Sequence, residues 1–542
     1  MLVRMFQVDW RSAIVACLML NGPCLLGQHD DLSPPPRTAE HPKNKVEVQP
    51  CNLSGRLKGE IGWITVPENR RDESSRTIKV NFLRFPARDK TELPAVFVLP
   101  GGPGQVIGLE DLGDSLRRHR YSLAHELEEF NRKRDVVVVN QRGSVEAPGI
   151  QSLPKYWIAD AAPWRLPMSF ERSQDRLTKG LKATLNRCGQ LNIDIRGYDI
   201  EHLVEDVDQL RRAFAYDQIA LRGSSFGSQW ALAYNARYPK RVDRMVFSGV
   251  EPVDHGYDSA TGVWSVFERI EDQLEAAETV DVPEIGLLGA VKETIARLEE
   301  NPVKVVGYHP RKGYEAEVVI GADDFRQYLL RPPVGSRQHS RAMLEKWPKL
   351  VLELYSENYS YLAAKIIDDR PEKFRQSLLL TLIDNSLGVS EERERKLATE
   401  PARRWLGNLN WFYHATRDSC PTPDVINQYR RMEVSQTPLL IVHGTLDLAT
   451  PIENARELLK YFEIGKLITV DGGTHAASYQ AATVDPSFLT YLSSFMNAPR
   501  PEEVFDEIPD QISLPPLDFE GDEEPSLFEQ LCPDLAVVNQ AD

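Results

Sequence analysis

The chain has 542 residues, a hydrophobic content of 42% and a formal net charge of −16. Its length and apolar content predict a globular protein with a large core. The acidic balance argues against nucleic acid as a partner, because binding to phosphate backbones requires clustered Lys and Arg, and it argues equally against adhesion to anionic membranes.

Residues 1–27 have the pattern of a cleaved signal peptide. Arg4 and Arg11 precede an apolar run at 13–20. We therefore expect an exported protein, periplasmic or extracellular, without a stable membrane span after signal cleavage. A lipid anchor at Cys17 is the alternative, although the apolar run before this cysteine is short. No other stretch approaches about 18 unbroken apolar residues, so no internal span is expected.

Residues 28–50 contain three consecutive prolines and many charges, which predicts a linker. After signal cleavage Cys51, Cys188, Cys420 and Cys532 remain. An even number is compatible with disulfides in an oxidising compartment, but the sequence does not choose among the pairings, and unpaired thiols are the alternative. No C-x-x-C pair and no H-E-x-x-H motif occurs, so no metal site is expected.

The rest of the chain divides into four predicted parts. Strand and helix patterns alternate over 51–251, a mostly helical insert covers 252–432, and strands return over 433–500. An acidic, Pro-rich tail follows at 501–542. The predicted strands are 62–66, 78–85, 95–99, 135–140, 218–222, 244–250, 438–443 and 466–470. Such alternation predicts an α/β fold whose mostly parallel sheet has helices on both faces and its site at the carboxyl ends of the strands.

A Gly-rich loop, Pro-Gly-Gly-Pro-Gly at 100–104, follows the strand at 95–99. Adjacent glycines allow backbone amides to approach a substrate oxygen closely. We expect Gly102 to donate to an oxyanion there, with Gly101 as the alternative donor. A simple turn is the other interpretation of this loop.

The segment Gly-Ser-Ser-Phe-Gly at 223–227 matches G-x-S-x-G, in which a serine nucleophile occupies a sharp turn between a strand and a helix. A strand at 218–222 precedes it and a helical pattern at 229–238 follows, as the motif requires. Ser225 is therefore the candidate nucleophile, and the amide of Phe226 is the candidate second oxyanion donor. The motif alone is weak, because Gly/Ser stretches usually form plain loops.

A serine nucleophile needs a base and an orienting carboxylate. Asp447 follows the strand at 438–443, and His475 lies in a small-residue loop after the strand at 466–470. Two other residues are weaker candidates for the base and the acid. His443 ends a strand and is expected to be a packed neighbour. Asp471 is too close in sequence to His475 to serve as its acid.

Five motifs occur in this order along the chain. They are Gly101-Gly102-Pro103-Gly104, Asn140-Gln141-Arg142-Gly143-Ser144, Gly223 to Ser228, Gly444 to Pro451 and Gly473-Thr474-His475. Together they resemble the prolyl iminopeptidase and tripeptidyl aminopeptidase branch of the α/β-hydrolases, over about 60–500, with the insert matched only in position and character. The resemblance implies the α/β-hydrolase fold, a helical cap over the site, and a serine aminopeptidase that releases N-terminal proline or short N-terminal peptides without a cofactor.

The chain departs from this branch at three positions. Pro100 stands where the family usually has His, Asn140 where it has Asp, and Phe226 where it often has Trp or Tyr. None of these changes removes a group of the Ser225, Asp447 and His475 set, but they leave the preferred substrate open.

The resemblance implies peptide substrates with a free N-terminus, whose ammonium group a carboxylate would bind by charge-assisted hydrogen bonds. Glu251, directly after the strand at 244–250, is the candidate, and a solvated loop carboxylate is the alternative. Arg142 is expected to order the loop near the site by hydrogen bonding, a structural role in place of contact with the substrate. A carboxylesterase or lipase-like hydrolase with the same three groups, and a non-catalytic binding protein on a hydrolase scaffold, are the alternative functions. The oligomeric state is left open.

Overall fold

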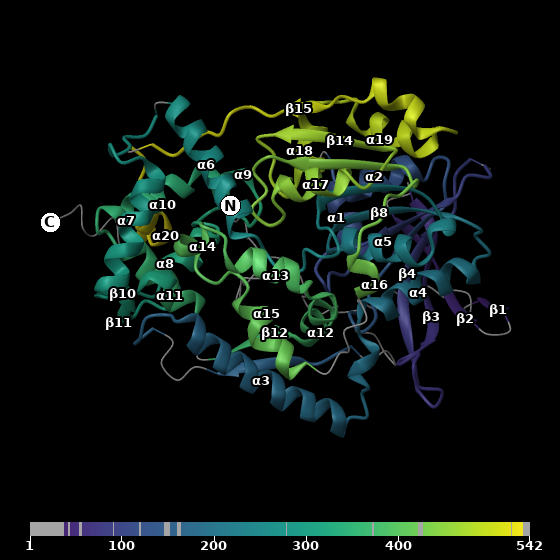
Figure 1. Ribbon diagram of the computed structural model, residues 1–542, viewed down its shortest axis with the longest axis horizontal. Helices are drawn as coiled ribbons and strands as arrows, with labels where there is room; N and C mark the ends of the chain where they lie inside the picture. Colours follow the sequence, from purple (N-terminus) through teal and green to yellow (C-terminus); the bar gives the residue numbers. More distant parts are fainter. Residues whose placement is uncertain are drawn as a thin grey trace.

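The computed structural model of the chain consists of a large sheet with helices on both faces and a helical cap beside it (Figure 1). It describes residues 37–41, 44–53, 57–89, 91–118, 121–145, 152–159, 164–277, 279–370, 373–420, 427–521 and 523–534. The predicted signal peptide at 1–27 lies outside these residues. Every helix in the described ranges is too short or too polar to serve as a transmembrane span.

The main sheet has 11 strands in the described part of the chain, in the order β1-β2-β3-β4-β6-β5-β8-β9-β13-β14-β15. Neighbours from β1 to β6 in this order pair antiparallel, and those from β6 to β15 pair parallel. The bounds are β1 Arg37–His41, β2 Asn44–Leu53, β3 Leu57–Pro67, β4 Thr77–Phe85, β5 Ala95–Leu99, β6 Val136–Val139, β8 Ile219–Ser225, β9 Val242–Val250, β13 Leu439–Gly444, β14 Gly465–Asp471 and β15 Gln511–Ser513.

Helices cover both faces of this sheet, which confirms the predicted fold class. One face carries α4 (Ile200–Ala213), α5 (Phe226–Arg237) and α17 (Ile452–Leu459). The other carries α1 (Leu109–Arg118), α2 (Leu123–Phe130), α18 (Ala477–Val484) and α19 (Phe488–Asn497). Helix α5 is buried on all sides from Phe226 to Asn235, because its small and apolar residues occur at every helical position.

Each predicted strand is present, with ends that shift by a few residues. One shift concerns function. The strand predicted at 218–222 continues to Ser225, and the helix predicted at 229–238 already begins at Phe226. The strand and the helix therefore meet at the candidate nucleophile with no intervening loop.

The range predicted as the cap, 252–432, contributes to two apolar cores. A hairpin of β10 (Val303–Tyr308) and β11 (Glu315–Ile320) interrupts its helices. The cap helices are α6 Ala260–Ala277, α7 Leu287–Glu300, α8 Ala322–Leu329, α9 Arg341–Glu345, α10 Trp347–Tyr355, α11 Ser360–Asp369, α12 Leu378–Leu387, α13 Glu391–Ala398, α14 Arg403–Leu406, α15 Trp411–Thr416 and α16 Asn427–Arg430. The helices from α6 to α11 share a core of their own, in which the rings of Phe267 and Trp347 stack at 4.4 Å, whereas α12 and α15 pack into the core of the sheet.

One segment that was predicted as sheet core packs on the cap instead. Strand β7 (Lys155–Ala159) pairs antiparallel with β12 (Lys373–Ser377), and α3 (Phe170–Gln190) lies along α15 (Figure 1). The hydroxyl of Thr178 in α3 donates to the carbonyl of Ala415 at 2.8 Å. The chain leaves the main sheet at the end of β6 before it reaches β7. Because β4 and β5 already pair with the two sides of β6, β7 cannot pair with β6 in the sheet.

The two polar ends of the chain are more ordered than predicted. Strands β1 and β2 include much of the expected linker at 28–50 and form the edge of the sheet, where proline and charge are tolerated. In the tail, β15 extends the opposite edge, Leu517 and Phe519 are buried in the cap core, and α20 (Leu527–Leu531) begins with a capping box. The structure contains no disulfide among Cys51, Cys188, Cys420 and Cys532, which are thiols.

Candidate active site

The predicted turn at Ser225 is present and strained. The backbone of Ser225 has φ 55°, a left-handed conformation that is uncommon for a residue with a side chain. A Cβ atom at Gly223 would lie 2.5 Å from the carbonyl oxygen of Gly227, and one at Gly227 would lie 2.1 Å from that of Leu99. Both positions therefore require glycine, and the turn lifts Ser225 to the carboxyl end of β8.

The predicted acid and base are hydrogen-bonded to each other. His475 Nδ1 lies 2.8 Å from Asp447 Oδ2. Asp447 is fully buried and also accepts from the amides of Ala449 at 2.9 Å and Thr450 at 3.0 Å, and from the Thr450 hydroxyl at 2.7 Å. This arrangement leaves the Nε2 atom of His475 for proton exchange with a serine.

The hydrogen bonds of Asp447 decide its charge. Burial alone would raise the pKa of this carboxyl, but the interaction with His475 and the hydrogen bond from Thr450 outweigh burial and lower the pKa well below its usual range. Asp447 is therefore ionised at neutral pH, and it fixes the ring of His475 with its Nδ1–H directed at the carboxylate.

Gly249 places His475 next to the serine. It precedes Val250, which is the register partner of Ser225 between β9 and β8. Its backbone has φ 56°, and a Cβ atom there would lie 2.6 Å from His475 Cε1 and 2.9 Å from Nδ1. The imidazole ring of His475 thus occupies the space that a side chain at 249 would fill. The role of Gly249 could not be predicted, because it depends on a contact between a strand and a loop that are far apart in sequence.

The Gly-rich loop lies against the nucleophile. A Cβ atom at Gly101 would be 3.2 Å from the Cβ atom of Ser225, and Gly102 has φ 108°. The Gly101 amide donates to Gln105 Oε1 at 2.9 Å, which leaves Gly102 as the better candidate of the two donors. The amide of Phe226 belongs to the first residue of α5, and a helix does not satisfy its own first amides. The predicted donor Phe226 directly follows Ser225, and the predicted donor Gly102 directly follows Gly101, which lies against Ser225.

Gln141 holds this loop in place. Its buried carboxamide accepts from the Gly104 amide at 2.6 Å and donates to the carbonyls of Gly101 at 2.9 Å and Pro100 at 3.3 Å. The sequence motif at 140–144 was noticed, but no role for Gln141 was inferred, because a glutamine gives no signal of which backbone groups it will satisfy.

Arg142 has the structural role that was expected for it. Its buried guanidinium pairs with both oxygens of Asp206 in α4 at 2.7 Å. It also donates to the carbonyls of Glu68 and Gly197, both at 2.6 Å. Arg142 therefore joins the antiparallel strands to α4 and has no recorded contact with the Gly-rich loop.

The two rivals lie where the sequence analysis placed them. His443 is fully buried at the end of β13, burial lowers its pKa, and its Nδ1 lies 3.2 Å from the carbonyl of Gly444. Asp471 is exposed and accepts from the Thr445 hydroxyl at 3.2 Å. The hydrogen-bond partner of His475 is Asp447 and not Asp471.

Glu251, the candidate for ammonium binding, lies close to Ser225. Its amide lies 2.9 Å from the hydroxyl oxygen of Ser228, whose hydroxyl lies 2.7 Å from the carbonyl of Ser225. Burial and the carboxylates of Asp384, Asp258 and Glu251 raise the pKa of Tyr413. The negative charges of Asp384, Asp258 and Glu251 therefore act together on one buried tyrosine.

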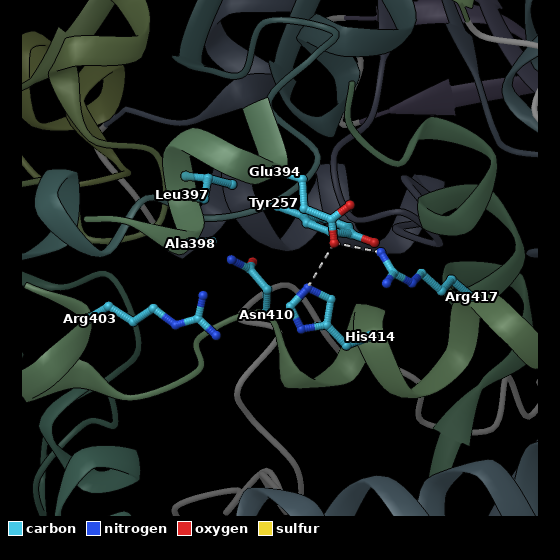
Figure 2. Close-up of a pocket in the computed structure, with 8 residues that line it drawn as sticks. All are labelled: Tyr257, Glu394, Leu397, Ala398, Arg403, Asn410, His414 and Arg417. Carbon is cyan, nitrogen blue, oxygen red and sulfur yellow. Dashed lines mark hydrogen bonds and ion pairs between the residues drawn. The ribbon is translucent and has the colours of Figure 1, made fainter. Parts of the chain in front are cut away.

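A cavity of about 210 Å³ lies in the cap on the other side of this tyrosine. Tyr413 stacks at 4.9 Å on Tyr257, which lines the cavity. Figure 2 shows Glu394 directed at His414 and Arg417, with distances of 3.7 and 2.7 Å. None of Ser225, Asp447 and His475 lines it. Within the described ranges, no group of His, Cys, Asp and Glu is suited to hold a metal ion.

Two family models match parts of this chain. A family model described as alpha/beta hydrolase fold matches residues 94–282, which include Ser225, and one described as TAP-like protein matches 410–501, which include Asp447 and His475. No curated protein matches the chain significantly.

Solved structures with similar chains include three hydrolases. An alpha/beta hydrolase from a Medee basin deep-sea metagenome library is 13% identical, with 77% of this chain and 94% of that chain covered and a TM-score of 0.31. An alpha/beta hydrolase fold protein from Chitinophaga pinensis is 10% identical, with 86% and 98% covered and a TM-score of 0.33. A laboratory-evolved potato epoxide hydrolase is 12% identical, with 80% and 99% covered and a TM-score of 0.33.

The contact between Gly249 and His475 predicts that a methyl group added at position 249 lowers activity. In Gly249→Ala the new Cβ displaces the imidazole, so we expect hydrolytic activity to fall at least about 100-fold, as misplacing a catalytic group by about 1 Å does. Gly189→Ala is the matched control, because a Cβ atom there meets no atom within 4 Å. Equal activity of the two variants in a steady-state assay would contradict the predicted placement of the base.

The lowered pKa of Asp447 predicts a pH-dependent stability. The pKa of an Asp in the unfolded chain is about 3.9. Because the pKa of Asp447 is lower in the folded protein, its ionised carboxylate stabilises the native state fully above about pH 3.9. This stabilisation is lost as the pH falls from there towards the pKa of the folded protein. We expect the melting temperature of wild type to exceed that of Asp447→Asn by a constant margin from about pH 5 to 8 and by a shrinking margin below about pH 4. Thermal melts measure this difference in melting temperature. A difference that grows as the pH falls would show that the pKa of Asp447 is raised and not lowered on folding.

Proposed function

We propose that this chain, which is an α/β hydrolase of the TAP-like branch, is an exported serine aminopeptidase that releases N-terminal proline or short N-terminal peptides through an acyl-enzyme. The observation that carries the proposal is the buried Asp447–His475 pair, which Gly249 seats beside the strained turn at Ser225. Export rests on residues 1–27 and remains a prediction from the sequence.

In the proposed reaction, Ser225 Oγ attacks the carbonyl carbon of the scissile amide while His475 Nε2 removes the hydroxyl proton. Asp447 keeps the ring oriented and stabilises the imidazolium. The amides of Gly102 and Phe226 donate to the oxyanion, and each such donor accelerates a reaction of this kind by about 10²–10³. His475 then passes the proton to the leaving amine, and water releases the acyl group by the same steps.

The carboxylates around Tyr413 support recognition of a free N-terminus. Glu251 comes from the carboxyl end of β9, Asp258 from the entry to the cap, and Asp384 from α12. An α-ammonium group would compensate part of this negative charge, whereas an acetylated N-terminus would not. We therefore assign Glu251 to the ammonium, with the other two carboxylates nearby.

The first experiment is hydrolysis of four chromogenic substrates by wild type and Ser225→Ala. The substrates are a proline amide, an Ala-Ala-Pro amide with a free N-terminus, the same amide acetylated, and a short acyl ester. We expect wild type to prefer the free-amine amides and Ser225→Ala to lose activity by at least about 10³-fold. Cleavage of the ester alone would favour the esterase alternative, and equal rates in both proteins would exclude Ser225 as nucleophile. Inactivity of wild type, with no labelling by a fluorophosphonate, would favour the binding-protein alternative.

A second experiment tests the ammonium site. In Glu251→Gln we expect KM for the free-amine tripeptide amide to rise about 10- to 100-fold, the worth of one hydrogen bond between charged groups, with the ester rate unchanged. Glu392→Gln, on the exposed surface of α13, is the matched control. If the two variants have the same KM, Glu251 has no part in ammonium binding.

A further inference from the structure

A histidine of the cap lies against the base. The ring of His339, in the loop 330–340 between α8 and α9, has its centroid 4.8 Å from that of His475, with the two planes at 45°. This contact joins the cap to the general base of the function proposed above.

The backbone around His339 is bonded to the loop that carries His475. The hydroxyl of Thr474, the residue before His475, donates to the carbonyl of His339. Arg341 donates to the carbonyl of Gly472 at 2.7 Å and to those of Pro515 and Pro516 at 2.6 and 2.7 Å. The cap loop is therefore held on both sides of the ring contact.

The conformation of His339 is also unusual. Its φ of 61° places it in the left-handed region, where residues with side chains are uncommon. Neighbouring contacts must hold this conformation in place, and residues of this kind cluster where a structure fixes a functional group. Here the group that the side chain reaches is the imidazole of His475.

We propose that His339 is a positioning residue, which holds the ring of His475 from the cap side while Gly249 provides the space for it on the sheet side. Asp447 and the Thr450 hydroxyl contact Nδ1 of the ring at 2.8 and 3.2 Å and hold one edge of it. Contacts on two sides of the ring restrict its rotation further. The proposal rests on the proposed function, in which His475 is the base, and it makes a competent base depend on the cap loop 330–340.

The test measures the rate at which a fluorophosphonate labels Ser225, because this reaction needs the base but no peptide. His339→Asn removes the ring and keeps a residue that tolerates the left-handed backbone. His339→Phe keeps an aromatic contact. We expect His339→Asn to label at least 10-fold more slowly than wild type and His339→Phe within about threefold of it. His414→Asn, elsewhere in the cap, is the matched control and is expected to label at the wild-type rate.

A second measurement separates positioning from damage to the fold. If His339 acts only through His475, adding His339→Asn to His475→Ala causes no further loss of the residual ester hydrolysis. Additive losses, a wild-type labelling rate in His339→Asn, or equal slowing by Asn and Phe would each overturn the proposal. Absence of labelling in wild type would instead overturn the proposed function, and this inference with it.

Discussion

The candidate site depends on close approaches at the carboxyl ends of β5, β8 and β9. A side chain at Gly223 would meet the carbonyl of Gly227, one at Gly227 would meet that of Leu99, and one at Gly249 would meet the ring of His475. Without a Cβ atom at 249, the imidazole of His475 can lie beside the register partner of Ser225, and its hydrogen bond to Asp447 then fixes the ring. The chemistry of the site therefore follows from a steric condition. Because three positions lack side chains, Ser225, Asp447 and His475 can approach one another. The hydrogen bond between Asp447 and His475 then holds the ring in place.

The parts of this fold that could be predicted are those whose signal is local. The parallel strands are runs of buried apolar residues, and the turn at Ser225, with the residues Asp447 and His475, follows such runs directly. Strands β1, β2 and β15 were not predicted, because edge strands tolerate polar residues and proline and so carry no burial pattern. Strand β7 was not predicted either, and the neighbours of β6 leave it no place in the main sheet.

The same distinction applies within the site. Ser225, Asp447 and His475 each follow a strand in a recognisable order, but the roles of Gln141, Gly249 and His339 depend on contacts between segments far apart in sequence. A buried glutamine, a glycine and a cap histidine have many uses. Only their neighbours in space show which use applies: Gln141 satisfies the loop at 100–104, and Gly249 and His339 flank one ring.

The course of the chain after the sheet has a consequence for how the cap can move. After β15 the chain leaves the sheet edge, inserts Leu517 and Phe519 into the cap core and ends its described course beside the cap with α20 (Figure 1). This crossing adds a further link between cap and sheet, besides the chain connections at either end of the cap, and packing holds it in place. The cap could swing away from the sheet as a hinged lid does only if Leu517 and Phe519 first left its apolar core.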